Sequence, residues 1–265
     1  MEKKNPYLPL KLFVFITFIV MVTVNALSVL LPLNGITPGE VSDSYPNLFA
    51  PAGITFSIWS LIYLLLAAHT LYQVGLFRSR KKKVNDELLR KTGIVFSVSS
   101  LVNAAWIFSW HYRIIPLSMV LMVCLLICLI DMAVIINTQS LSPREKLLIR
   151  LPFSVYFGWI TVATIANATA LLVSLGWNGF GIPESIWTII ILAVGALIGT
   201  ATLLRFKSIA YGLVLIWAYT GILIKHTTAS GFGGQYPGVI FTTSICMALF
   251  ALAIIYTLVK KPQAK

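Results

Sequence analysis

Aromatic side chains at helical spacing mark the part of this sequence that is best suited to bind a ligand. In the apolar segment 54–77, Phe56, Trp59 and Tyr63 follow one another at intervals of three and four residues. A helix would therefore place all three rings on one face. Flat ring faces of this kind favour a flat, largely apolar ligand.

Two further segments, 92–112 and 150–175, carry aromatic, amide and small side chains at the same spacing. These residues are Asn103, Trp106 and Trp110 in the first segment, and Trp159, Ala163 and Asn167 in the second. Because an amide that faces lipid is costly, both Asn side chains should point into a bundle. With Trp59 and Tyr63 they predict an aromatic-lined cavity with two amide groups. Two alternatives stay open: the rings could form an interfacial belt, and the amides could join helices.

Asp131 and His69 are the ionisable side chains in apolar segments that could carry protons. Such residues within a membrane span are often functional, so both are candidates for a proton relay. Alternatively, Asp131 pairs with a base such as Arg144, and His69 is a hydrogen-bonded packing residue. The sequence has no HExxH, GxSxG, Walker-loop or paired-carboxylate motif, which favours ligand handling over catalysis. The three cysteines lie in apolar runs without metal-ligand spacing, so neither a metal site nor a disulfide is expected.

The composition of the chain is that of a membrane protein. Its 265 residues are 58% hydrophobic and 11% charged, whereas soluble domains carry about 25% charged residues. Eight apolar segments are long enough to cross a bilayer core, which takes about 20 residues. They cover residues 12–33, 54–77, 92–112, 114–137, 150–175, 185–204, 208–225 and 237–259. None alternates with a period of two, so the sequence predicts an all-α membrane helix bundle rather than a β-barrel.

Basic residues are distributed unevenly between the two sides of this predicted topology. Of the 20 Lys and Arg, all but Arg113 and Lys225 lie in the terminal segments and in segments 78–91, 138–150 and 205–207. The positive-inside rule then places both termini in the cytoplasm, with the chain in the plasma membrane. Topology thus accounts for the net charge of +12. The lipid bilayer is the expected partner, and nucleic acid is not.

Three motifs in these segments resemble the TspO/MBR family, also called translocator proteins or tryptophan-rich sensory proteins. The motifs are a proline-containing start followed by W-x3-Y, then N-x2-W, then W-x3-A-T-x2-N. They are formed by Pro51, Trp59 and Tyr63, by Asn103 and Trp106, and by Trp159, Ala163, Thr164 and Asn167. The long loop between the first two segments is also similar to the family.

The resemblance implies that residues 1–175 form a five-helix TspO-like bundle and that residues 176–265 add a three-helix extension. It implies an intramembrane site for a flat hydrophobic ligand, either a porphyrin or another tetrapyrrole such as haem, or a sterol-like lipid, with no cofactor required. The pocket residues that it implies are Trp59, Trp106, Trp159, Ala163 and Asn167. The chain departs from the family where Pro51, Ala52 and Gly53 replace a double proline. An acidic residue that is usual near the start of the fourth helix is also missing.

Sensing or transport of such a ligand is the function that the sequence favours. One alternative is an eight-helix proton-coupled secondary carrier that uses Asp131 or His69. Others are an enzyme acting on tetrapyrroles and a scaffold or assembly protein within a larger membrane complex. A homodimer formed through the extension is a further open alternative.

Overall fold

The computed structural model describes residues 8–31, 33–77 and 86–260. Most of these described residues are helical, and none of them lies in a β-strand. Eight helical stretches in this part of the chain are long and apolar enough to cross a membrane. The predicted all-α bundle with eight spans is therefore confirmed.

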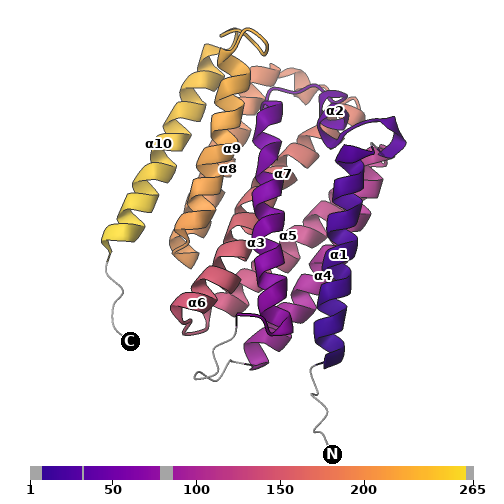
Figure 1. Ribbon diagram of the computed structural model, residues 1–265. Coiled ribbons are helices and arrows are strands. Elements are labelled where there is room, and N and C mark those ends of the chain that lie inside the picture. The colour runs from indigo at the N-terminus through magenta and orange to yellow at the C-terminus, as the bar shows by residue number, and fades with distance from the viewer. Residues whose placement is uncertain (1–7, 32, 78–85, 261–265) are drawn as a thin grey trace, which may run out of the picture. The chain divides into compact units, whose positions relative to one another are not determined.

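Eight long helices form these stretches, and six short elements connect or extend them (Figure 1). The long helices are α1 (Leu8–Leu30), α3 (Ile58–Val74), α4 (Asp86–His111), α5 (Ile115–Asn137), α7 (Leu151–Ser174), α8 (Glu184–Phe206), α9 (Ile209–Thr227) and α10 (Pro237–Val259). The short elements are η1 (Leu33–Gly35), α2 (Pro38–Asp43), η2 (Gly53–Ser57), α6 (Pro143–Glu145), the π-helical turn η3 (Lys146–Arg150) and η4 (Gly179–Gly181). Because α6 and η3 run directly into α7, that span begins at Pro143, earlier than the sequence predicted.

The chain divides into two compact units. The first unit comprises Met1–Pro38 and Trp59–Phe153, and the second comprises Gly39–Ile58 and Ser154–Lys265. The first unit holds α1, α4, α5 and nearly all of α3, and the second holds α8, α9, α10 and most of α7. The sequence-based division after residue 175 separates family-like helices from additional ones, and it stays a prediction.

Helix α4 is central to the first unit, where it packs along both α1 and α5. Its buried face carries small polar residues, among them Ser97 and Ser100, which let neighbouring helices approach closely. The Ser100 hydroxyl donates to the Phe96 carbonyl oxygen at 2.9 Å, so burial leaves that donor satisfied within the helix.

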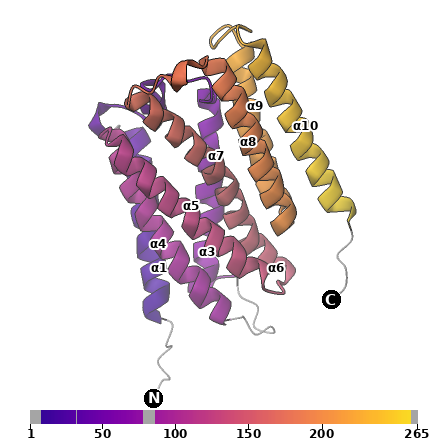
Figure 2. The ribbon, with the colours of Figure 1, turned by 180° about the vertical axis from the view of Figure 1, so that it is seen from behind.

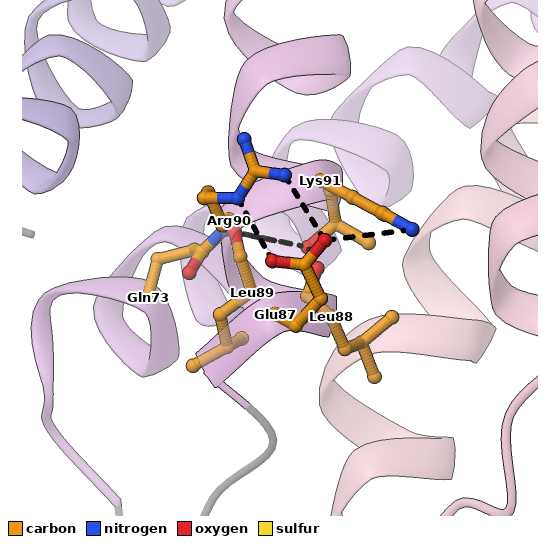
Figure 3. A network of polar contacts seen from close by, with 7 residues as sticks. Gln73, Glu87, Leu88, Leu89, Arg90 and Lys91 are labelled. Carbon is orange, nitrogen blue, oxygen red and sulfur yellow. Dashed lines mark hydrogen bonds and ion pairs between the residues drawn. The ribbon is translucent and has the colours of Figure 1, made fainter.

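Helix α4 also begins about two turns earlier than its apolar segment predicted. Its first turn carries Asp86 and Glu87, whose charges are favourable at a helix N-terminus. Glu87 accepts hydrogen bonds from the Arg90 guanidinium at 2.9 and 3.0 Å (Figure 3). The amide of Gln73 in α3 donates to the Leu89 carbonyl oxygen at 2.9 Å, which fastens α3 to this turn. A prediction from hydropathy excludes such a turn because its side chains are charged.

In the second unit, α10 packs along both α8 and α9 (Figures 1 and 2). Small residues allow the close approach, as in other membrane bundles. A Cβ atom added at Gly199 of α8 would lie 3.2 Å from the Phe250 ring. One added at Gly158 of α7 would lie 2.9 Å from Val214 of α9. The Tyr219 hydroxyl also donates to the Leu192 carbonyl oxygen at 2.9 Å, which joins α9 to α8.

The loop that precedes α3 is fastened to α8 and α9. The Leu48 amide donates to Glu184 Oε1 at 2.9 Å, and the Leu48 carbonyl oxygen lies 2.8 Å from His226 Nε2. The Ala52 amide donates to the Gly221 carbonyl oxygen at 3.0 Å. The Trp217 indole donates to a carbonyl oxygen of η2 at 3.0 Å. Helices α8 and α9 therefore hold the segment 48–55 in place.

Candidate functional site

Helices α3 and α4 bring four of the aromatic side chains into one stacked column within the first unit. The Trp59 and Tyr63 rings lie 5.5 Å apart with an interplanar angle of 14°. Trp59 and Trp106 lie 6.3 Å apart at 30°, and Trp106 and Trp110 lie 5.9 Å apart at 21°. Trp106 and Trp110 are buried, whereas Trp59 and Tyr63 are only partly buried. The α3 end of the column therefore presents ring surface, and the α4 end supports it.

Asn103 lies beside this column, and it joins two helices. Its Oδ1 accepts a hydrogen bond of 2.7 Å from the Asn25 amide of α1, and the Asn103 side chain is fully buried. The Asn25 amide also donates to the Met21 carbonyl oxygen at 2.8 Å. The interhelical role that the sequence left open is thus present for Asn103. The motif offered no signal for Asn25, because the pairing depends on how α1 packs against α4.

The other predicted ligand-binding residues belong to the second unit. Trp159 is 3% exposed, and its ring meets the Phe56 ring edge to face at 5.9 Å. Asn167 is buried and Ala163 is partly buried. Phe56 lies in η2, which leads directly into α3. Because side chains three residues apart eclipse in a 3₁₀-helix, this turn is compatible with the predicted face shared by Phe56 and Trp59, which stays a prediction.

The two proposed relay residues differ in their environment. His69 of α3 is fully buried, with its Nδ1 atom 2.8 Å from the Leu148 carbonyl oxygen. Its ring is packed edge to face against Phe96 at 5.4 Å and against Phe153 at 4.7 Å. Among the described residues, His69 Nε2 has no hydrogen-bond partner. Asp131 of α5 is exposed.

A cavity of about 410 Å³ lies in the second unit, away from the motifs that the sequence singled out. Residues 46–49 form one wall, the end of α7 and the turn 176–179 form another, and the first turns of α8 complete it. Trp177 and Trp187 line it with rings 5.1 Å apart, and Glu184 is the ionisable side chain among the described residues that line it. This site was not predicted from the sequence, because its Gly-rich turn between Trp177 and Trp187 is typical of a plain connector.

Comparison with protein families matches residues 11–256 to the family described as TSPO-like protein. The match includes the last three spans as well as the first five, of which three carry the motifs. No curated protein and no solved structure matches the chain. With eight helices in its described residues able to cross a membrane, this chain is a multi-pass membrane protein that belongs to the TSPO-like family.

Proposed function

We propose that this protein is a TspO-like membrane receptor or transporter that binds a flat hydrophobic ligand of the porphyrin class. The observation that carries this proposal is the stacked column, in which Trp59 and Tyr63 present ring surface and Trp106 lies buried behind Trp59. Stacking against an indole that is itself held in place costs little ordering on binding. Trp159 and Asn167 of the second unit are the further ligand contacts that the family motif implies, and they are tested separately.

Titration with protoporphyrin IX in detergent, followed by the shift of its main absorbance band, tests the column directly. We expect Trp59→Ala to weaken binding at least about tenfold, because both the stacked ring and its buried apolar area are lost. Trp59→Phe keeps a ring and should lose less. The same titration of Trp159→Ala tests the second group independently.

Phe108→Ala is the matched control for these variants. Phe108 lies in α4, two residues from Trp106, and its side chain is 44% exposed. Its removal deletes an aromatic ring without changing the column, so binding should stay within about twofold of the parent protein. Unchanged porphyrin affinity in Trp59→Ala would rule out the column as the binding site. Weaker porphyrin binding in Phe108→Ala would show that the loss of affinity in Trp59→Ala is not specific to the column.

We further propose that both termini lie in the cytoplasm and that the membrane is the plasma membrane, as the distribution of basic residues indicates. Ser230, in the turn after α9, and Ser140, between α5 and α6, would then lie on opposite sides. In intact cells an impermeant maleimide should label Ser230→Cys, and it should label Ser140→Cys only after permeabilisation. The reversed pattern would contradict this orientation.

One observation favours a second candidate function, a proton-coupled carrier. His69 is fully buried, and its Nε2 has no hydrogen-bond partner among the described residues, which is the environment in which a relay group would act. Asp131, the other candidate, is exposed. A carrier requires pH-dependent uptake into vesicles that is lost in Asp131→Asn or in a His69 variant that still folds. Uptake that is independent of pH would rule it out.

A further inference from the structure

We propose that the cavity at the junction of α7 and α8 is a second binding site, which takes a small organic cation whose ammonium group carries an apolar body. The site is formed entirely by residues of the second unit, so its test is independent of the test of the porphyrin proposal. Its volume of about 410 Å³ lies within the usual range of small-molecule sites, roughly 300–1,000 Å³.

The chemistry of the cavity walls selects the charge of the ligand. Glu184 is the ionisable side chain among the described residues that line the cavity, and neither Lys nor Arg lines it. Two indoles, Trp177 and Trp187, provide ring faces that attract a cation. A carboxylate and indole faces together favour an ammonium group, and the same carboxylate repels an anion. A single carboxylate among rings is also a poor site for Ca²⁺, which takes about six to eight oxygen ligands.

The carboxylate is held in place by the fold. Glu184 lies in the first turn of α8, where the helix dipole favours a negative charge. Its Oε1 atom accepts a hydrogen bond from the Leu48 amide at 2.9 Å, across 136 residues of sequence. The Leu48 carbonyl oxygen is in turn fixed by His226, at 2.8 Å from Nε2. A ligand would therefore meet a carboxylate that is already oriented, which reduces the entropy lost on binding.

The two indoles, like the Glu184 carboxylate, are held in place by the fold. Trp187 Nε1 donates to the Gly179 carbonyl oxygen at 2.8 Å, and its ring lies 5.1 Å from that of Trp177. Gly179 has a φ of +64°, and a Cβ atom there would lie 3.1 Å from the Trp187 ring. The turn thus requires glycine at this position to seat Trp187. Asn178 Oδ1 closes the turn by accepting from the Phe180 amide at 3.0 Å.

Two probes of the same shape separate charge from shape. Benzyltrimethylammonium carries the cation, and neopentylbenzene replaces its nitrogen with carbon and is neutral. Calorimetric titration of the full-length protein in an uncharged maltoside detergent, corrected for empty micelles, gives both affinities. We expect the cation to bind the protein at least about tenfold more tightly than the neutral probe. Equal affinities would overturn the proposal.

Glu184→Gln removes the charge and keeps an oxygen that accepts from the Leu48 amide. We expect it to weaken binding of the cation about tenfold and to leave the neutral probe unchanged. Asp43→Asn is the matched control, because it removes a carboxylate that pairs with Lys225 at 3.8 Å and does not line the cavity. Affinity for the cation that is unchanged in Glu184→Gln, or reduced as much in Asp43→Asn, would overturn the assignment.

A second variant gives a result that misfolding does not mimic. Trp177→Leu removes one ring face, and it should weaken binding of the cation about threefold more than binding of the neutral probe. Because the result is a ratio of two affinities in one preparation, partial unfolding would lower both and leave the ratio unchanged. A ratio equal to that of the parent protein would remove the indole from the site.

The ammonium could belong to a lipid headgroup or to a free solute, and competition distinguishes them. A soluble short-chain phosphatidylcholine should displace the benzyltrimethylammonium probe if the headgroup is the natural occupant. Displacement by trimethylammonium compounds without acyl chains, but not by this lipid, would assign a free solute. If neither competes, the proposed recognition of ammonium is wrong.

Discussion

Replacement of His69 by alanine is expected to lower the free energy of unfolding by about 2–4 kcal/mol. The side chain is fully buried between the rings of Phe96 and Phe153, so its loss leaves a cavity that packed aromatics fill poorly. The Leu148 carbonyl oxygen would also lose its hydrogen bond to Nδ1. Equilibrium unfolding in a mixed detergent, followed by circular dichroism, measures the change.

Two substitutions separate the packing role of His69 from its hydrogen bond. His69→Phe fills most of the space and loses the bond to Leu148, so it should cost about 1–2 kcal/mol. Leu71→Ala, on the exposed face of the same helix, should stay within about 1 kcal/mol of the parent protein. If His69→Ala were as stable as the parent, the packing role would be wrong. If His69→Phe folded but abolished pH-dependent uptake, His69 would be a relay group.

Replacement of Gly221 by alanine is expected to destabilise the protein by about 1–3 kcal/mol. The added Cβ atom would lie 2.7 Å from Thr55 Cγ2 and 2.8 Å from Thr55 Cβ, and it would meet Thr55 Oγ1 still more closely. Thr55 is unable to retreat easily, because hydrogen bonds fasten η2 and the residue before it to α9. The Ala52 amide donates to the Gly221 carbonyl oxygen, and the Trp217 indole donates to the Thr55 carbonyl oxygen.

Gly53→Ala is the matched control for this prediction. Gly53 lies in the same turn, its φ is not positive, and a Cβ atom there would have no neighbour within 4 Å. Its stability should therefore stay within about 0.5 kcal/mol of the parent protein. The double variant Gly221→Ala/Thr55→Ala removes two of the three clashing atoms and should recover part of the loss. Additive losses in the double variant would show that the Thr55 contact is not the cause.

The Gly221 contact connects stability to the proposed ammonium site. Residues 46–49 line the α7–α8 cavity, and the same loop continues through η2 into α3, which carries Trp59. In Gly221→Ala, displacement of this loop from α9 should therefore weaken binding of the ammonium probe. Helices α8 and α9 thus have a definite structural role, since they hold the segment 48–55.

Sequence alone determined the number of spans and the family. Both rest on local properties, because a run of about 20 apolar residues must form a helix in lipid whatever its neighbours are. Trp59 and Tyr63 could be assigned to one face for the same reason, since helical spacing fixes the direction of side chains on one helix. Hydropathy does not distinguish the 3₁₀ turn η2, which holds Phe56, from the helix that it precedes.

Only the tertiary structure decided which distant residues meet. Asn103 pairs with Asn25 across 78 residues, and Leu48 contacts both Glu184 and His226, of which the latter is 178 residues away. Hydropathy and helical spacing carry no information on such pairs, because they describe each helix separately, whereas a contact depends on the rotation and tilt of two. The Gly-rich turn after α7 therefore reads in the sequence as a plain connector, and the fold makes it one wall of an acidic, indole-lined cavity.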